Sequence, residues 1–522
     1  MPNAYFAHGV ASGDPRPTSV VLWTRVTPTA ASKPGSGQGP NVSVTWQVST
    51  TSAFTTIAAT GKVTTGPARD HTVKVDVTGL KPAAPYYYRF VYAATHSAVG
   101  RTRTAPAATT SPANLRFGVV SCANLQAGWF SSYRHLAKRN DLHAVLHLGD
   151  YIYEYGPGEY GYGNADVDIR KHEPAHEILK LADYRQRHAQ YKRDVDLQAL
   201  HAKYAFIHTW DDHEVADDAW KGGAVNHTEG VEGSFTARRA AAHQAFDEWM
   251  PVRMSGSAAP GDGDQIYRRL QFGDLAEITM LDLRTYRDKQ LAAQVDPAEA
   301  DPDRTITGRA QMDFLKDSLT RRVAQWKLVG NPVMIAPFTF AGLPQNLVDP
   351  VNDTAGLLPR DGVPYNVDQW DGYTDDRREV FETLRDNGVT DSLFITGDIH
   401  SGWACDLPAD KATYLASRNS VGVEFVATSV TSNNLKDITG TPRRTTSVAV
   451  EETLKANNPH IKYLNFDDHG YSVLDITAKR AQMDWYILGD RADKNTSSTW
   501  TTSWATTAGS QTVRQVDAPV GA

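Results

Sequence analysis

Short runs of alternating apolar and polar residues fill the first hundred positions of the chain. They cover Ser19 to Trp23, Val42 to Val48, His71 to Val77 and Tyr86 to Phe90, with breaks rich in Gly, Pro and Ser, such as Lys33 to Gly37, between them. Alternation with a period of two predicts strands that each bury one face. Turn signals at this spacing predict an all-β sandwich.

After the Pro- and Ala-rich segment 105–112, the pattern changes to apolar runs separated by longer stretches of helical periodicity. Strands that alternate with helices predict an α/β domain. Strands are expected at 115–121, 144–148, 205–210, 278–281, 327–330, 392–396 and 423–427. Apolar residues at helical spacing predict helices around 129–136, 309–319 and 380–384.

These patterns divide the chain into a β-sandwich domain at 1–108, an α/β domain at 113–490 and a Ser- and Thr-rich tail at 491–522 whose packing they do not define. A chain of 522 residues is longer than a single core usually grows, which agrees with this division. Loops rich in Gly, Asp and Asn are expected at 154–175, 217–232, 341–375 and 431–462. So many long loops indicate that they shape a functional site.

Composition narrows the possible partners. The chain has 53 basic and 60 acidic residues, a balance that disfavours a general grip on nucleic acid or on an anionic membrane. No apolar run is long enough to span a membrane, and the first residues lack the basic and apolar regions of a signal peptide. We therefore expect a soluble chain that binds phosphate, if at all, at a local site. The oligomeric state is left open.

Side chains that bind metals follow four of the predicted strands. Because strand carboxyl ends meet at one edge of a sheet, these side chains are expected to converge. A thiolate and a phenolate suit a ferric ion, whereas clustered carboxylates suit a hard divalent cation such as calcium. The candidate metal ligands are Cys122, Asp150, Tyr153, Asp212, Asp398 and His400.

Five spaced motifs carry a family resemblance. They are Ser121-Cys122, Gly149 to Tyr155 (GDYIYEY), Trp210 to Glu214 (WDDHE), Leu281 to Arg287 (LDLRTYR) and Gly397 to Trp403 (GDIHSGW). In this order they resemble the PhoD-like alkaline phosphatase family, as does the N-terminal stretch from Phe6 to Pro15. More broadly, the chain is similar to the purple acid phosphatase branch of the calcineurin-like metallophosphoesterases, although Asp212 and Asp398 replace a neutral asparagine and a neutral histidine of that branch.

The resemblance implies a fibronectin- or immunoglobulin-like sandwich followed by a four-layer α/β/β/α metallophosphoesterase domain. It implies Fe(3+) bound by Cys122, Asp150, Tyr153 and His400, and Ca(2+) bound by Asp150, Asp212 and Asp398. The two acidic replacements favour calcium over zinc or manganese. His213, with Asp150 and Arg284, is the expected catalytic set, and His213 is placed beside the leaving group.

The implied activity is hydrolysis of phosphate esters by a metal-activated water, without a covalent phosphoenzyme. Phosphodiesters, including phospholipid head groups cleaved in the manner of a phospholipase D or teichoic-acid-like polymers, are the preferred substrates, and a plain alkaline phosphomonoesterase is the alternative. The family is typically exported, so a secreted or extracytoplasmic location is expected. From a different class, the chain would be a non-catalytic cell-surface binding protein with a structural metal site.

Plainer interpretations stay open for each residue. Cys122 would be a buried thiol or form a disulfide with Cys405, and Tyr153 would be one more packed aromatic. His213 would only orient Asp212, and Arg284 would be salt-bridged, as would Arg287, instead of gripping phosphate.

One further motif belongs to another family. The segment from His460 to Asp467 fits the HxKxxxxD signature of classical phospholipase D enzymes. That chemistry needs two such motifs, and this one occurs once in the chain.

Overall fold

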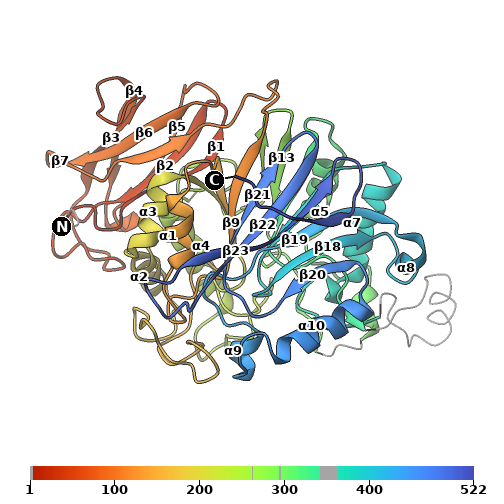
Figure 1. The fold of residues 1–522 in the computed structure, drawn as a ribbon. Coiled ribbons are helices and arrows are strands. Elements are labelled where there is room, and N and C mark those ends of the chain that lie inside the picture. Colours follow the sequence, from red (N-terminus) through yellow and green to blue (C-terminus); the bar gives the residue numbers. More distant parts are fainter. Residues whose placement is uncertain (1–3, 262, 293–295, 341–361, 522) are drawn as a thin grey trace.

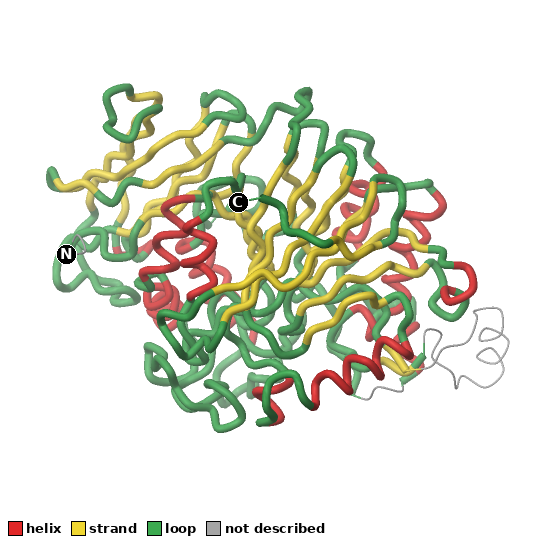
Figure 2. Tube along the Cα trace, viewed as in Figure 1, coloured by secondary structure: helices red, strands yellow, loops and turns green. Residues whose placement is uncertain are grey.

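The computed structural model describes residues 4–261, 263–292, 296–340 and 362–521. These residues form two large sheets and two smaller ones (Figures 1 and 2). The ten-stranded sheet contains, in spatial order, β24 (Val513–Val516), β23 (Ser498–Thr507), β22 (Arg480–Leu488), β21 (Gly470–Ile476), β9 (Leu115–Val120), β10 (Ala144–Leu148), β11 (Ala205–Thr209), β1 (Val10–Arg16), β2 (Ser19–Arg25) and β5 (Thr72–Thr78).

The seven-stranded sheet contains β12 (Arg268–Phe272), β13 (Ala276–Met280), β14 (Trp326–Asn331), β17 (Ser392–Thr396), β19 (Ser420–Val426), β18 (Gly402–Pro408) and β20 (Ile461–Asn465). A five-stranded sheet contains β4 (Ile57–Thr65), β3 (Val42–Ser49), β6 (Pro85–Tyr92), β7 (Thr95–His96) and β8 (Gly100–Arg103). The last sheet pairs β15 (Thr339–Phe340) with β16 (Val363–Pro364).

The α-helices of the described residues are α1 (Ser131–Lys138), α2 (Leu181–Tyr191), α3 (Val195–Lys203), α4 (Phe235–Trp249), α5 (Arg309–Thr320), α7 (Thr374–Asp386), α8 (Tyr414–Ser417), α9 (Leu435–Thr439) and α10 (Thr446–Asn457). Short 3-10 turns are η1 (Pro67–Arg69), η2 (Pro297–Ala300) and η3 (Trp370–Gly372). None of the described helices is long and apolar enough to cross a membrane.

The two large sheets pack face to face. One apolar cluster joins Leu146 of β10 and Ile207 of β11 to Ile278 of β13 and Ile395 of β17. A second cluster covers the outer face of the ten-stranded sheet with α1 to α4, and a third covers the outer face of the seven-stranded sheet with α5 and α7. Figure 2 shows helices on both sides of the central strands. The order is therefore helices, sheet, sheet, helices.

Parallel strands give both large sheets a common carboxyl edge. β9, β10 and β11 are parallel neighbours in one sheet, and β13, β14, β17 and β19 are parallel neighbours in the other. The predicted strands 144–148 and 392–396 coincide with β10 and β17. Most ligand candidates lie just beyond the ends of these strands.

The N-terminal region has its own apolar core but shares a sheet with the rest of the chain. The core contains Leu22 of β2, Val44 of β3, Val73 of β5 and Tyr88 of β6. β1 pairs in parallel with β11, at Ser12 and Ala205, so β1, β2 and β5 extend the ten-stranded sheet. The assignment of the N-terminal region to a fibronectin- or immunoglobulin-like topology, and of the larger region to a calcineurin-like fold, both stay predictions.

The expectation that each N-terminal strand buries a single face is wrong for β2. All seven of its residues are buried. Leu22 faces the N-terminal core, whereas Trp23 packs against Trp249 of α4 on the opposite side. The second face is covered because β2 lies in the large sheet and not in an isolated sandwich.

The predicted loop 431–462 is also partly wrong, because it contains α9 and α10. Helix α10 buries few of its residues, among them Leu454 and Glu451, so its apolar period is weak. Part of the predicted loop 341–375 lies outside the described residues. The Ser- and Thr-rich tail, which the sequence pattern left unplaced, contributes β23 and β24 to the edge of the large sheet.

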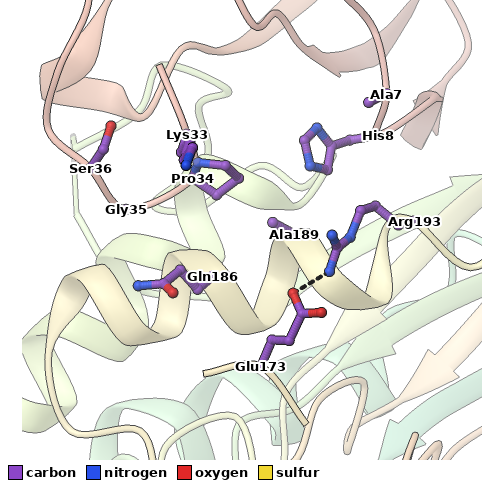
Figure 3. Close-up of a pocket in the computed structure, with 10 residues that line it drawn as sticks. All are labelled: Ala7, His8, Lys33, Pro34, Gly35, Ser36, Glu173, Gln186, Ala189 and Arg193. Atoms are coloured by element: carbon purple, nitrogen blue, oxygen red, sulfur yellow. Dashed lines mark hydrogen bonds and ion pairs between the residues drawn. The ribbon is translucent and has the colours of Figure 1, made fainter. Parts of the chain in front are cut away.

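A cavity of about 550 Å³ separates the N-terminal region from α2. Figure 3 shows Lys33 to Ser36 on one side and Gln186, Ala189 and Arg193 on the other. Arg193 pairs with Glu173 at its rim. No predicted metal ligand lines this cavity.

A buried group of histidines surrounds Tyr151. Its ring lies 5.2, 6.3, 5.9 and 5.5 Å, between ring centroids, from those of His147, His188, His201 and His208. Burial lowers the pKa of His147 and of His188 to about 3. Burial also lowers the pKa of His201 and of His208 well below its ordinary value. All four are therefore neutral in the folded protein at neutral pH.

We predict that acid destabilises the fold through these histidines. In the unfolded chain they take up protons near pH ~6.5, whereas in the folded chain they stay neutral, so stability falls as pH drops below that value. The change His188→Leu should make the melting temperature less dependent on pH between about 5 and 7. Neither ring nitrogen of His188 has a hydrogen-bond partner among the described residues, so no polar contact is lost. Thermal melts followed by circular dichroism would measure this.

The matched control is His176→Leu, since His176 is exposed. That variant should keep the dependence of the parent protein. Identical pH dependence in His188→Leu and the parent would contradict the prediction.

Candidate metal centre

The ligand candidates occupy unusual backbone conformations at the strand ends. Cys122 follows β9, Asp150 follows β10, and Asp398 and His400 follow β17. Their φ angles are 58°, 55°, 58° and 50°, in the left-handed region that residues with a Cβ rarely adopt. Such strain collects at functional sites. Here it turns each chain sharply where it leaves the sheet.

Two glycines allow the loops to approach one another. Gly149 has a φ of 104°, and a Cβ placed on it would lie 2.5 Å from the Cβ of Asp211. A Cβ on Gly397 would lie 2.8 Å from the Cβ of Ser121, across the two sheets. The glycine of each Gly-Asp pair is therefore required for the close packing that brings the next residue, an aspartate, into the site.

The four residues predicted to bind iron meet in one place. Donor atoms of Cys122, Asp150 and His400 lie within 4.8 Å of one another. The hydroxyl of Tyr153 donates to Asp150 Oδ2 at 2.8 Å and lies 3.5 Å from His400 Nε2. The other oxygen of Asp150, Oδ1, is buried and has no hydrogen-bond partner among the described residues. A cation would supply that partner, so the residues fit a metal.

The electrostatics point the same way. Burial and the neighbouring Asp150 raise the pKa of Cys122 well above its ordinary value, and burial and Asp150 do the same for the pKa of Tyr153. Both groups stay protonated unless a positive charge is added. A bound cation reverses this and favours thiolate and phenolate. The donor set thus suits an ion that accepts sulfur, nitrogen and phenolate oxygen.

Carboxylates gather beside this set. Asp150 belongs to a second group with Asp212 and His213, and Asp212 belongs to further groups with Asp211 and Asp398 and with Asp217 and Asp218. Each group has ligand atoms within 4.8 Å of one another. The shared Asp150 lies between the thiolate side and the carboxylate side. This oxygen-rich half fits a hard divalent cation such as calcium.

Arg284 lies among these carboxylates. It is buried and donates to Asp211, to Asp368 Oδ1 at 2.9 Å and to Asp398 Oδ1 at 3.2 Å. Arg287 also pairs with Asp368 Oδ1, at 2.7 Å. These contacts favour the salt-bridged interpretation of both arginines. Their contact with phosphate stays a prediction.

His213 is held as a proton donor. Its Nδ1 lies 2.8 Å from Glu154 Oε2, and its ring stacks on Tyr153 with centroids 4.2 Å apart. Burial opposes its positive charge, but Asp212 and Glu154 outweigh burial and raise the pKa of His213 well above its ordinary value. Glu154 occupies Nδ1, whereas Nε2 lies 3.8 Å from Asp217 Oδ1 at the pocket that both residues line.

Glu214, the last residue of the third motif, joins two loops. Its carboxylate accepts backbone N–H groups from Asp150 at 3.1 Å, Tyr151 at 2.6 Å and Asp211 at 2.8 Å. A buried acceptor with several donors fixes the geometry around it. Glu214 therefore holds the turns after β10 and β11 together.

A pocket of about 390 Å³ opens onto the site. It is lined by Asp150, Tyr155, Tyr160, Asp212, His213, Asp217, Asp218, Gln290, Asn366, Val367, Asp368, Asp398 and His400. Sequence reasoning missed several of its acidic residues. The i+5 and i+6 spacing of Asp217 and Asp218 from Asp212 was a usable signal, whereas Asp368 sits in a predicted loop with no motif around it.

The structure decides between the alternatives for the cysteines and for the lone phospholipase motif. Both cysteines are free, so the disulfide between Cys122 and Cys405 is absent. Cys405 is buried in the cluster that covers the outer face of the seven-stranded sheet.

His460 is buried, and its Nε2 contacts the backbone oxygen of Pro337 at 2.7 Å. Neither His460 nor Asp467 lines the pocket of the metal ligands.

The carboxylates of the site lie so close together that they raise one another's pKa values. Burial, together with Asp212 and Asp150, raises the pKa of Asp211 to about 8 despite the nearby Arg284. Burial, Asp368 and Asp212 raise the pKa of Asp218 to about 8. Like charges this close disfavour full ionisation. Bound cations would relieve that repulsion.

Comparisons with known proteins agree across the chain. The family described as PhoD-like phosphatase matches residues 117–485, and the PhoD-like phosphatase N-terminal domain matches residues 1–106. Alkaline phosphatase D of Bacillus subtilis (strain 168) is 36% identical over 487 residues, 92% of this chain and 77% of the relative. The solved structure of PhoD superposes with a TM-score of 0.86 at 33% identity, covering 100% of this chain and 94% of that one.

We predict that chelation makes the protein sensitive to alkali. In the chelated protein Asp211 and Asp218 hold protons up to pH of about 8, whereas in the unfolded chain they lose them near pH ~4. The folded state then binds more protons, so its stability falls as pH rises from about 6.5 to about 8.5. Untreated protein should show the opposite trend, because cations bind better to ionised carboxylates. Melting temperatures with and without chelator would test this.

The change Asp218→Asn removes one of the crowded charges. In the chelated protein, this variant should lose less stability than the parent protein as the pH rises. If chelated and untreated protein respond identically to pH, the carboxylates are not a cation site.

Proposed function

The chain belongs to the PhoD-like alkaline phosphatase family, which implies phosphoester hydrolysis, and from this premise we propose that it hydrolyses phosphate esters with an Fe(3+)–Ca(2+) centre. Cys122, Asp150, Tyr153 and His400 would hold the iron, and Asp150, Asp212 and Asp398 the calcium. The observation that carries the proposal is the convergence of a thiol, a phenol, an imidazole and a carboxylate with an unpartnered oxygen.

The two cations would supply an activated water and would neutralise the charge that builds on phosphate. The chain's own residues do the rest. Asp150 would serve both halves of the site, because it belongs to both ligand groups. Arg284 balances the charge of Asp211, Asp368 and Asp398 and keeps those side chains in place. The expected contact between Arg284 and phosphate also belongs to this proposal.

His213 acts as the general acid in this scheme. Glu154 holds the imidazole through Nδ1, and Tyr153 supports it from one face. The proton on Nε2 passes to the oxygen of the leaving group as its bond to phosphorus breaks. His213 also lines the pocket, where a substrate would lie. Within the scheme, Asp150 and His213 are the principal catalytic residues.

Phosphodiesters are the substrates that we propose, including phospholipid head groups or teichoic-acid-like polymers. The pocket is bordered by Asp217, Asp218 and Asp368. A phosphomonoester dianion carries one more negative charge than a diester and is repelled more by these carboxylates. An alkaline phosphomonoesterase is the second candidate, favoured by the similarity to alkaline phosphatase D.

We also propose that the protein works outside the cytoplasm, as the family resemblance implies. The domain limits 1–108 and 113–490, with a tail at 491–522, belong to the same set of proposals. The matched ranges 1–106 and 117–485 support a boundary near residue 110. The non-catalytic alternative, a surface-binding protein, would require that no ester is hydrolysed.

We predict that the purified protein is coloured. A Tyr153 phenolate or Cys122 thiolate on ferric iron gives a charge-transfer band in the visible spectrum. The change Tyr153→Phe should remove or greatly weaken the phenolate band, whereas Tyr155→Phe, two residues away in the same motif, should keep it. Absorption spectra with iron and calcium analysis would measure this. A colourless protein with full esterase activity would refute the iron site.

A kinetic test addresses His213 and the substrate. The change His213→Asn should lower kcat/KM for aryl diesters by about 10²- to 10⁴-fold, and more for poor leaving groups than for good ones. The exposed His176→Asn should leave the activity unchanged. The parent protein should hydrolyse bis(4-nitrophenyl) phosphate with a higher kcat/KM than 4-nitrophenyl phosphate. Equal losses for all leaving groups would assign His213 to orienting Asp212, and hydrolysis of neither ester would favour the surface-binding alternative.

A further inference from the structure

A loop that the mechanism does not use contacts two of the proposed iron ligands. It follows β19, and its residues 430 to 432 bond through their backbone N–H groups to the oxygens of Ser121 and Cys122. Ser432 and Asn433 are buried in it. One of them contacts Tyr153 and the other contacts His400. None of residues 430 to 433 lines the pocket in which a substrate would lie.

The Ser432 hydroxyl has two acceptors and one proton. Its Oγ lies 2.6 Å from the Tyr153 hydroxyl oxygen and 3.0 Å from the backbone oxygen of Cys122. Tyr153 already donates its own proton to Asp150 Oδ2. Ser432 is thus the donor in the contact with Tyr153. When Tyr153 becomes a phenolate, its charged oxygen is the stronger acceptor, and charge-assisted hydrogen bonds are about twice as strong as neutral ones.

The backbone of Ser432 is held from two sides. Its carbonyl accepts from His469 Nε2 at 2.9 Å and from Ser429 Oγ at 2.8 Å. Burial and the nearby Arg491 lower the pKa of His469 well below its ordinary value, so this histidine stays neutral. The hydroxyl of Ser432 is therefore presented to Tyr153 by a fixed segment.

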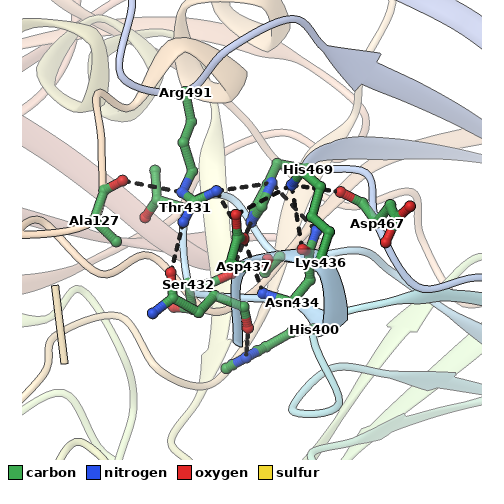
Figure 4. Close-up of polar contacts among 12 residues, drawn as sticks. Ala127, His400, Thr431, Ser432, Asn434, Lys436, Asp437, Asp467, His469 and Arg491 are labelled. Atoms are coloured by element: carbon green, nitrogen blue, oxygen red, sulfur yellow. Dashed lines mark hydrogen bonds and ion pairs between the residues drawn. The ribbon is translucent and has the colours of Figure 1, made fainter. Parts of the chain in front are cut away.

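Arg491 anchors the same segment. It is buried and donates to Asp437 Oδ2 at 2.8 Å, Asn433 Oδ1 at 2.6 Å and the backbone oxygen of Ala127 at 3.0 Å. Figure 4 shows these contacts leading from Arg491 toward His400. The backbone oxygen of Asn433 lies 2.7 Å from His400 Nδ1. That contact places a proton on Nδ1 and leaves Nε2 free for a metal.

We propose that Ser432 is a positioning residue that donates a hydrogen bond to the Tyr153 phenolate and so sets how strongly that oxygen gives electrons to the bound iron. The assignment rests on the proposed iron centre. A hydrogen bond withdraws electron density from the phenolate oxygen and lowers the energy of its filled orbitals. Transfer of charge from that oxygen to ferric iron then needs more energy, and the absorption band lies at shorter wavelength.

The test is the change Ser432→Ala in the full chain, purified with its metals. The phenolate band is expected to move to longer wavelength while the iron content stays that of the parent. Loss of an outer partner of a metal ligand typically costs about 10- to 100-fold in activity or affinity, and kcat is expected to fall toward the smaller figure. The conservative Ser432→Thr keeps the hydroxyl and should keep the band where it is in the parent.

Thr431→Val is the matched control. Thr431 is the preceding residue in the same loop, equally buried, and its hydroxyl bonds to the backbone oxygen of Asn124 at 2.7 Å instead of to a metal ligand. This variant should leave the band unmoved. An equal shift in Thr431→Val, or an unshifted band in Ser432→Ala at full iron content, would overturn the role of Ser432. A colourless parent protein would instead overturn the iron centre itself, and the assignment with it.

Discussion

Mutual repulsion among buried carboxylates is the constraint on which the rest of the site depends. The buried Asp150, Asp211 and Asp212 meet the partly buried Asp398 where two sheets end. At such separations like charges interact strongly, and a protein can keep them together only by adding positive charge or by leaving some of them protonated. Arg284 supplies one positive charge permanently. The unpartnered oxygen of Asp150 indicates where the remaining positive charge belongs.

The scaffold opposes this repulsion with stiff local structure. The left-handed conformations of Cys122, Asp150, Asp398 and His400 are costly, and they persist because the surrounding packing fixes them. Glu214 ties the turns after β10 and β11 with three backbone hydrogen bonds. The loop around Ser432, anchored by Arg491, supports the ligands. A site built in this way is preorganised, so its shape is expected to change little when its charges are neutralised.

Some parts of the fold and of the site could be predicted from the sequence and others could not, for physical reasons. Strands such as β10 and β17 are fully buried between layers, so their apolar runs are unmistakable, and the ligands follow them directly. By contrast, the second buried face of β2 depends on Trp249, a residue far along the chain. Asp368 and Ser432 have roles that arise only from tertiary contacts, and no sequence motif predicts those roles. Helix α10 was not predicted because it buries few of its residues, so its sequence has only a weak apolar period.

The parallel pairing of β1 with β11 has a consequence for how the polypeptide is made. Strand β1 is translated well before its neighbour in the sheet, at Ala205, which follows the other N-terminal strands and the first ligand loops. Pairing over such a sequence separation forms slowly, because a long loop must close first. Until then one edge of β1 is open to other chains. The N-terminal region therefore contributes strands to the ten-stranded sheet before their partner strand has been made. We expect it to need protection during synthesis until residues 205 to 209 have been translated.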